Sequence, residues 1–513
     1  MASSGRARSR SCLRGIASAV AVALACLAAA GSQAQTREHD SWMGVYFNGA
    51  KVGYSSEHSA PTTYNGQPAV HVTSRSVMHM TLLGTTVEQD ETEDFVTKSD
   101  STPIEETLDV KSNGSEMHIQ ATYDLSRHEV RCRIAAGGHA TTKTLAIPEG
   151  AVLATDPSML AEGRKLAVGQ KLTFTYLNPI SIALEQAQLE VTGKETITDA
   201  STSKLVATFV VKSNTPLGDF VTWETDDGDT IKGEMRLGGI TLAMLKETPE
   251  GARQPAAAHP STPGSYVPPA DFAIQTAVKV DRAIANERQV RSLQATISGI
   301  PQNALLLSDD RQRVTDVTGA PPALAAKFDV NAKPFDPSGS ARLPIKDPAL
   351  AAFRKKAPYL DIGDVNIEST AARLRAGDSN AYEVCVRIRN WVHRVMTPDA
   401  SIGVPRSASD IFLRRRGVCR DFATLYAALA RSAGVPTRLC AGIVYGNGMF
   451  FYHAWAESWV GQWVAFDPTL YRPGLAADFV DATHIKFAEG DVTDMFGAVA
   501  LIGKLRITIL NAE

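Results

Sequence analysis

Three residues toward the C-terminal end of the chain have the types and the order that acyl transfer needs: Cys419, His453 and Asp467. A cysteine thiolate is a strong nucleophile, and a helix N-terminus, nearby cations and a paired histidine all favour the thiolate over the thiol. The histidine in turn needs a third group that holds its ring in one orientation. We therefore predict a nucleophile, a base and an orienting carboxylate at these three positions.

Cys419 stands at the predicted start of a helix that runs from Cys419 or Arg420 to Ala433. Gly434 lies where a left-handed C-cap is expected. The first backbone N–H groups of such a helix can bind a developing oxyanion. Gly417 is expected to let a substrate backbone come close. The predicted inner face of the helix carries Phe422, Leu425, Tyr426 and Leu429.

A second, shorter helix is predicted just before this one. Ser407 followed by Asp410 is a capping-box pattern, and it opens a helix that we expect to run through Arg416. The cations around the thiol in sequence are Arg414, Arg415, Arg416 and Arg420. The three consecutive arginines either complete the end of the short helix or attract an acidic substrate.

His453 and Asp467 are expected on neighbouring strands. Alternation along residues 451–459 puts His453 on the same face as Trp455. Gly461-Gln462 predicts a two-residue hairpin turn into a strand at residues 463–466, and such a hairpin would bring Asp467 beside His453. Each of the three site residues also has an ordinary explanation as packing, surface or turn. Their order on a helix, a strand and the next strand favours the catalytic interpretation.

The sequence around these residues resembles four successive blocks of the bacterial transglutaminase-like superfamily. His453 follows Cys419 by 34 residues and Asp467 follows His453 by 14, and the resemblance covers residues 345–490. The blocks are Gly417-Val418-Cys419-Arg420-Asp421-Phe422-Ala423, Arg431-Ser432-Ala433-Gly434-Val435-Pro436-Thr437-Arg438, His453-Ala454-Trp455-Ala456-Glu457 and Trp463-Val464-Ala465-Phe466-Asp467-Pro468-Thr469.

This resemblance implies a papain-like α+β core, a triad of Cys419, His453 and Asp467, and thioester chemistry on amide bonds. The superfamily includes proteases, amidases, cross-linking enzymes and members without activity. We expect a thiol-dependent hydrolase or acyltransferase acting on a protein or peptide, with hydrolysis favoured because no acceptor-binding motif is recognisable. The alternative is a catalytically silent binding or assembly protein of the periplasm. Neither a cofactor nor a metal is expected.

The charge balance and the N-terminus bear on partners and location. Lys+Arg 52 against Asp+Glu 55 gives no basic excess for a nucleic acid partner. Arginines followed by the apolar residues 16–30 and Ser32-Gln33-Ala34 predict a signal peptide over residues 1–34. Its removal would lower the net charge from −3 to −7. We expect a periplasmic or secreted protein without a stable membrane span, and no lipid on Cys26 because the usual leucine three residues earlier is absent.

Composition along the chain predicts four segments after the signal peptide. Residues 36–249 read as a largely antiparallel β domain of the wrapped or sandwich type. Residues 250–271 form a Pro-rich linker. Residues 272–344 form a small bridging β module or complete one of the sheets on either side, and residues 345–513 hold the catalytic domain.

Four cysteines remain after cleavage of the signal peptide. Cys385 and Cys440 either form a bridge in an oxidising compartment or are buried free thiols, and we favour the second interpretation because free cysteine is so often buried. The four are Cys132, Cys385, Cys419 and Cys440.

Overall fold

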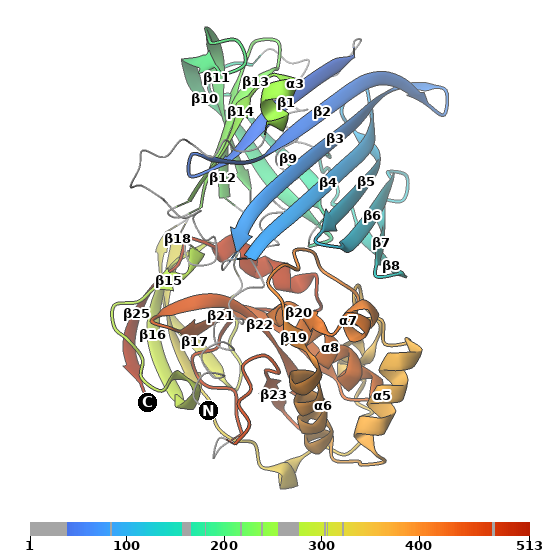
Figure 1. Ribbon diagram of the computed structural model, residues 1–513, viewed down its shortest axis with the longest axis vertical. Coiled ribbons are helices and arrows are strands. Elements are labelled where there is room, and N and C mark those ends of the chain that lie inside the picture. Colours follow the sequence, from blue (N-terminus) through green and yellow to red (C-terminus); the bar gives the residue numbers. More distant parts are fainter. Residues whose placement is uncertain are drawn as a thin grey trace. The chain divides into compact units, whose positions relative to one another are not determined.

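Strands dominate residues 39–246, and longer helices enter after residue 364. The computed structural model describes residues 38–82, 85–155, 166–179, 181–215, 218–237, 240–254, 276–301, 304, 306–320, 323–474 and 478–513. The chain forms two compact units, one within Val20–Gln275 and one built mainly from Thr276–Glu513 (Figure 1). The predicted signal peptide and most of the predicted linker lie outside the described residues.

The N-terminal unit contains one antiparallel sheet of 14 strands. β1 pairs with both β2 and β14, so the sheet extends outward from β1 and β14 in two sequential halves, ending at β8 and β9. The strands are β1 (His39–Phe47), β2 (Ala50–Tyr64), β3 (Gln67–Leu82), β4 (Thr85–Lys98), β5 (Pro103–Ser112), β6 (Ser115–Asp124), β7 (Glu129–Ala136), β8 (His139–Ala146), β9 (Lys171–Asn178), β10 (Ala183–Asp199), β11 (Lys204–Thr215), β12 (Gly218–Glu224), β13 (Thr230–Leu237) and β14 (Ile240–Lys246). The short helix α3 (Pro249–Arg253) follows them.

Tight turns and alternation produce this sheet. Asn65-Gly66 and Asn113-Gly114 both have positive φ at both residues, the geometry of a two-residue hairpin turn that matches strand twist. Along β6 the side chains alternate between buried and less buried, with Met117, Ile119 and Ala121 inside. The predicted antiparallel β region is confirmed.

The C-terminal unit combines helices with three smaller sheets, which confirms the predicted α+β class. Its helices are α5 (Val365–Arg375), α6 (Ala381–Val395), α7 (Ala408–Arg414) and α8 (Cys419–Ser432). The sheet next to α8 has the order β15 (Val278–Lys279), β22 (Met449–Trp459), β21 (Thr437–Gly446) and β24 (Ile485–Gly490), with β23 (Trp463–Phe466) also paired to β22. A parallel two-stranded ladder joins β19 (Thr397–Pro398) to β20 (Arg416–Gly417).

The segment predicted as a bridging module shares a sheet with the end of the chain. β17 (Gln312–Ala320), β18 (Ala323–Asn331), β16 (Ser292–Pro301) and β25 (Arg506–Ala512) pair in that order.

Three local predictions around the site can be compared with the structure. α8 begins at Cys419 and Gly434 follows it with φ +91°, as predicted. α7 is two residues shorter than predicted because Arg415 adopts a left-handed conformation and ends it. The β22–β23 hairpin pairs Trp459 with Trp463, so its turn has three residues and not two. No helix within the described ranges has the length and apolar character to span a bilayer.

Candidate active site

Cys419 is the first residue of α8, and its side chain is fully buried. α8 packs against β22, the strand that carries His453. The first N–H groups of an α-helix have no partner within the helix and carry partial positive charge. A negative charge that develops at Cys419 therefore lies at the favourable end of α8.

The start of α8 is fixed by the side chain of Asp421. Its carboxylate accepts a hydrogen bond from the backbone N–H of Val418 at 3.1 Å and lies 3.1 Å from Nη2 of the buried Arg406. A Cβ on Gly417 would stand 2.3 Å from Oδ2 of Asp421. The space beside the Cα of Gly417 is therefore taken by this cap, which explains the glycine, and the close approach of a substrate there stays a prediction.

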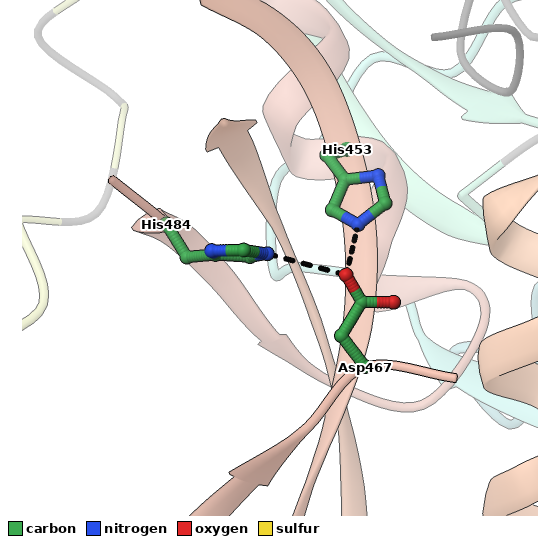
Figure 2. Close-up of side chains that lie close together, drawn as sticks. All are labelled: His453, Asp467 and His484. Carbon is green, nitrogen blue, oxygen red and sulfur yellow. Dashed lines mark hydrogen bonds and ion pairs between the residues drawn. The ribbon is translucent and has the colours of Figure 1, made fainter. Parts of the chain in front are cut away.

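His453 lies in the middle of β22 and is fully buried. Its Nε2 is 2.8 Å from Oδ2 of Asp467 (Figure 2). Its Nδ1 is buried and has no aligned hydrogen bond. The Cys419 thiol is close enough to raise the pKa of the imidazole. One ring nitrogen is thus held by the carboxylate, and the other is left for proton exchange.

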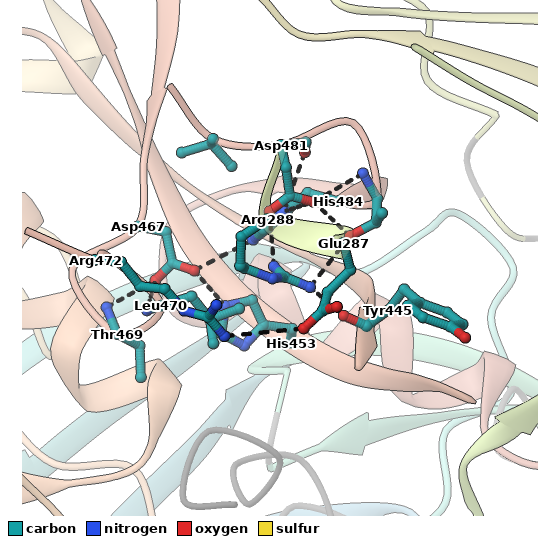
Figure 3. A network of polar contacts seen from close by, with 12 residues as sticks. Glu287, Arg288, Tyr445, His453, Asp467, Thr469, Leu470, Arg472, Asp481 and His484 are labelled. Atoms are coloured by element: carbon teal, nitrogen blue, oxygen red, sulfur yellow. Dashed lines mark hydrogen bonds and ion pairs between the residues drawn. The ribbon is translucent and has the colours of Figure 1, made fainter. Parts of the chain in front are cut away.

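Asp467 follows β23, one step beyond the Ala456–Phe466 pair of the hairpin. Its Oδ1 accepts the backbone N–H groups of Thr469 at 2.8 Å and Leu470 at 3.2 Å. Its Oδ2 faces Nε2 of His453 and, at 3.2 Å, Nε2 of His484. Four donors surround this buried carboxylate (Figure 3). They hold it in one orientation and favour its ionised form.

The electrostatics of the pair follow from these contacts. Burial alone would lower the pKa of His453, but the charge and hydrogen bond of Asp467, assisted by Cys419, raise it to about 10. Burial alone would raise the pKa of Asp467, but the attraction of His453 and the hydrogen bonds from both histidines hold the pKa of that carboxyl well below its usual range. The pair is therefore an imidazolium and a carboxylate at neutral pH.

His484 is a functional-site residue that sequence reasoning missed. It lies just before β24 and is buried at 2% exposure. Its Nδ1 is 3.2 Å from the backbone oxygen of Asp481, and Asp481 forms an ion pair with Arg288 at 2.7 Å. His484 and Asp481 lie beyond the four sequence blocks and Arg288 lies far upstream, so no local pattern pointed to them.

The other thiols are structural. All four described cysteines are free and buried. Burial raises the pKa of Cys385 to about 11 and that of Cys132 to about 12, and it raises the pKa of Cys440 well above its usual range. These three thiols have little thiolate character at neutral pH.

The arginines near Cys419 divide into two groups. Arg414 and Arg416 are more than half exposed and pair with Asp410 at 2.8 Å and Asp399 at 2.7 Å. Arg420 is buried, and its Nη2 donates to the backbone oxygen of Val404 at 2.7 Å. The buried guanidinium of Arg420 is therefore bound by Val404 and Asp421, while Arg414 and Arg416 form ion pairs at the end of α7 and on β20.

His453, Asp467 and His484 bring two nitrogens and an oxygen close together, as the ligands of a metal ion would be. Both histidine Nε2 atoms point at the same carboxylate oxygen (Figure 2). A metal would require the three atoms to point at a common centre about 2.0–2.2 Å from each. The observed geometry is that of two hydrogen bonds to one carboxylate.

Comparison with known proteins identifies the class of this unit. Residues 368–468 match the transglutaminase-like superfamily, and they form a transglutaminase-like core. Over 100 residues the chain is 31% identical to the uncharacterized protein ML0607 of Mycobacterium leprae. The aligned region covers 16% of this chain and 36% of that protein. The chain thus covers about a third of the length of this relative.

Two solved structures are each similar to a part of the chain. A proposed cysteine protease from Cytophaga hutchinsonii is 20% identical, with a TM-score of 0.31 over 44% of this chain and 86% of its own. A beta-barrel-like protein with a domain of unknown function from Brucella abortus is 9% identical, with a TM-score of 0.28 over 41% of this chain and 95% of its own.

Proposed function

We propose that this protein is a thiol-dependent hydrolase that cleaves amide or peptide bonds, with Cys419 as nucleophile, His453 as general acid and base, and Asp467 as the group that orients His453. The observation that carries the proposal is the state of His453. Its Nε2 is bound by Asp467, while its buried Nδ1 has no aligned partner and the Cys419 thiol lies within interaction range.

The residues can perform acyl transfer in two balanced halves. Sγ of Cys419 attacks the carbonyl carbon and forms an S–C bond, and the carbonyl oxygen becomes an oxyanion at the N-terminus of α8. The C–N bond then breaks as His453 gives its proton to the leaving amine, which leaves a thioester. In the second half a water attacks the thioester, His453 takes its proton, and the C–S bond breaks to release a carboxylic acid and the thiolate–imidazolium pair.

The surroundings of the pair support this chemistry. Cys419 and His453 are both fully buried, and electrostatic interactions are stronger where water is excluded. Asp467 keeps His453 in one orientation without itself taking the proton, because its pKa is held low. The arrangement supplies a nucleophile, a proton carrier and an orienting group from α8, β22 and the residue after β23.

Hydrolysis is the half-reaction that we propose for the thioester. Water needs no binding site of its own, whereas a lysine acceptor would need one. We propose a protein or peptide substrate, and a site of action in the periplasm or the medium on the basis of the signal peptide predicted at residues 1–34. N-terminal sequencing of protein isolated from its native cells tests the location, since a chain that begins before residue 34 would contradict cleavage there.

Active-site labelling tests the nucleophile and the base together. The full chain is treated with a thiol-reactive acyl-transfer probe, and the wild type is compared with Cys419→Ala, His453→Ala and the matched control Cys385→Ala. We expect label on Cys419 in the wild type and in the Cys385 variant. We expect no label in the Cys419 variant and at least about 10²-fold slower labelling in the His453 variant. Equal labelling of all four proteins, or of none, would refute the proposal and leave a binding protein with this fold.

A further inference from the structure

We propose that His484 is a positioning residue of this site: a buried imidazolium, held by Asp481 and Arg288, that fixes Asp467 as a carboxylate from a second direction. The inference rests on the proposed function, in which Asp467 orients His453. It adds a charged layer behind the catalytic aspartate that no local sequence pattern indicated.

Both ring nitrogens of His484 face oxygen atoms that can accept a hydrogen bond. Nε2 is 3.2 Å from Oδ2 of Asp467. Nδ1 is 3.2 Å from the backbone oxygen of Asp481 and 3.4 Å from its Oδ1. A carbonyl oxygen and an ionised carboxylate cannot donate a proton. A neutral imidazole has one acceptor nitrogen, so it would place a lone pair against one of these oxygens. Two protons on the ring satisfy every contact.

The carboxyl groups of Asp481 and Asp467 are both held in their ionised form. Asp481 receives Nη1 of Arg288 at 2.7 Å on Oδ2 and the backbone N–H of Thr483 at 3.0 Å on Oδ1. Arg288 and His484 hold the pKa of Asp481 below its usual range, although burial opposes them. Asp467 accepts from two backbone N–H groups as well as from the histidines. A cation between two such carboxylates is compensated despite its burial.

Three arginines from different parts of the chain bind residues 478–481, the segment just before His484. Arg288, in η2 (Glu287–Gln289), binds Asp481 and also donates to the backbone oxygen of Tyr445 on β21. Arg311 donates to the backbone oxygens of Val480, at 2.7 Å, and Asp481. Arg389 of α6 binds Oδ2 of Asp478 at 2.8 Å. Three buried or partly buried guanidinium groups therefore hold the segment that leads to His484, and Figure 3 shows Arg288 beside Asp481.

Few other charged or titratable groups surround the imidazole of His484 within the described residues. Asp467 and Asp481 supply negative charge, and the neighbouring groups on β22 are His453, with ring centroids 5.5 Å apart, and the perpendicular ring of Trp455 at 5.4 Å. Arg288 lies behind Asp481. A cavity of about 410 Å³ is bordered by Asp467, Asp481 and His484. It gives water a route to exchange protons with this side of the network.

The contact with His484 acts on His453 through Asp467. Nε2 of His484 faces Oδ2 of Asp467, the same oxygen that faces Nε2 of His453. Loss of this donor should loosen the carboxylate that orients His453, so kcat should fall while KM changes little. A residue that served only as packing would lower the free energy of unfolding without this split between kcat and KM.

Two substitutions separate the charge from the hydrogen bond. His484→Gln keeps an N–H that can reach Asp467 but removes the charge, and His484→Ala removes both. We expect kcat within about 10-fold of wild type for Gln and a further 10-fold or greater loss for Ala, with KM little changed in both. His118→Gln, a histidine replaced on β6 in the N-terminal unit, is the matched control and should change neither quantity. A kcat of the Ala variant equal to that of the Gln variant would overturn the proposal.

A second measurement does not depend on turnover. Nitrogen-15 NMR of histidine-labelled full-length protein, with the His484→Gln variant used for assignment, distinguishes protonated from unprotonated ring nitrogens. We expect both nitrogens of His484 to be protonated at pH 7, and one unprotonated nitrogen would overturn the proposal. Absence of any enzymatic activity would refute the proposed function, while this measurement would still decide the state of His484.

Discussion

At the scale of single residues, Asp467 is the centre of the site. Its two oxygens accept from two backbone N–H groups and two imidazoles, so its position is determined by the chain that follows it, by the middle of β22 and by the residue before β24. The same contacts explain why a fully buried acid remains ionised. The proton on His453 depends on that charge, and the protonation state of the proposed base is therefore set by Asp467.

Asp467→Asn tests this dependence. The amide keeps the shape but loses the negative charge that raises the pKa of His453 to about 10, so the pKa of His453 should fall toward or below its usual value near 6.5. The alkaline limb of kcat/KM should move down by several pH units, and kcat should fall by about 10²–10⁴-fold because the favoured ring orientation is also lost. The measurement is a pH–rate profile. A limb that stays near pH 10 would show that another group holds the proton.

The sequence predicts those site residues that lie next to a local structural signal and misses those that do not. Cys419, His453 and Asp467 each lie next to a local signal, namely a helix start, an alternating strand and a hairpin turn, and the structure brings these three side chains together. His484 carries no such signal. Its partners are Asp467, Asp481 and Arg288. They come together only in the folded chain, where η2 packs against the segment before β24, almost two hundred residues further along the sequence.

At the scale of elements, the N-terminus of α8 determines where Cys419, the proposed nucleophile, lies. Asp421 caps the helix through Val418, and Arg406 braces Asp421 while donating to the backbone of Arg416. The sequence predicted the start of this helix correctly from its apolar periodicity. It did not predict the use of Gly417, because the competitor for that space, the Asp421 side chain, is visible only in three dimensions.

Gly417→Ala should disrupt this element. The new Cβ would meet Oδ2 of Asp421 at 2.3 Å and Nη2 of Arg406 at 2.8 Å, so the cap must move. We expect a loss of about 1–3 kcal/mol in the free energy of unfolding and slower alkylation of Cys419. The matched control is Gly363→Ala, whose Cβ would meet nothing within 4 Å. Chemical denaturation and iodoacetamide labelling measure both effects, and equal behaviour of the two variants would refute the role of the cap.

At the scale of the whole molecule, the two units have different interiors. The C-terminal unit surrounds α8 with apolar side chains, and α8 itself is buried over almost its whole length. The buried face of the N-terminal sheet includes several acids, among them Glu57, Glu91, Glu93 and Glu106. Strand alternation predicted the sheet correctly, but it could not predict buried acids, because glutamate at alternate positions is usually taken to face solvent.

Glu106 offers a test of this interior. Burial raises its pKa to about 7, although the hydrogen bond from Tyr123 opposes the shift. The folded state therefore keeps a proton that the unfolded chain releases above pH 4.5, and the stability of the N-terminal unit should fall as pH rises from about 4.5 to 7. Glu106→Gln removes this loss while its amide oxygen still accepts from Tyr123. The variant should match wild type at pH 4 and be more stable at pH 8 by up to roughly 3 kcal/mol.

The same variant tests whether the two compact units unfold separately. A chain with two cores is not expected to unfold in one two-state step, so calorimetry at pH 8 should resolve two transitions. Glu106→Gln should raise one of them, and Gly417→Ala should lower the other. If both substitutions shift a single common transition, the units unfold as one cooperative body. If Glu106→Gln stabilises equally at pH 4 and pH 8, the proton on Glu106 is not the cause. Separate shifts would mean that the acidic interior of the sheet and the cap of α8 are independent determinants of stability, each acting within its own unit.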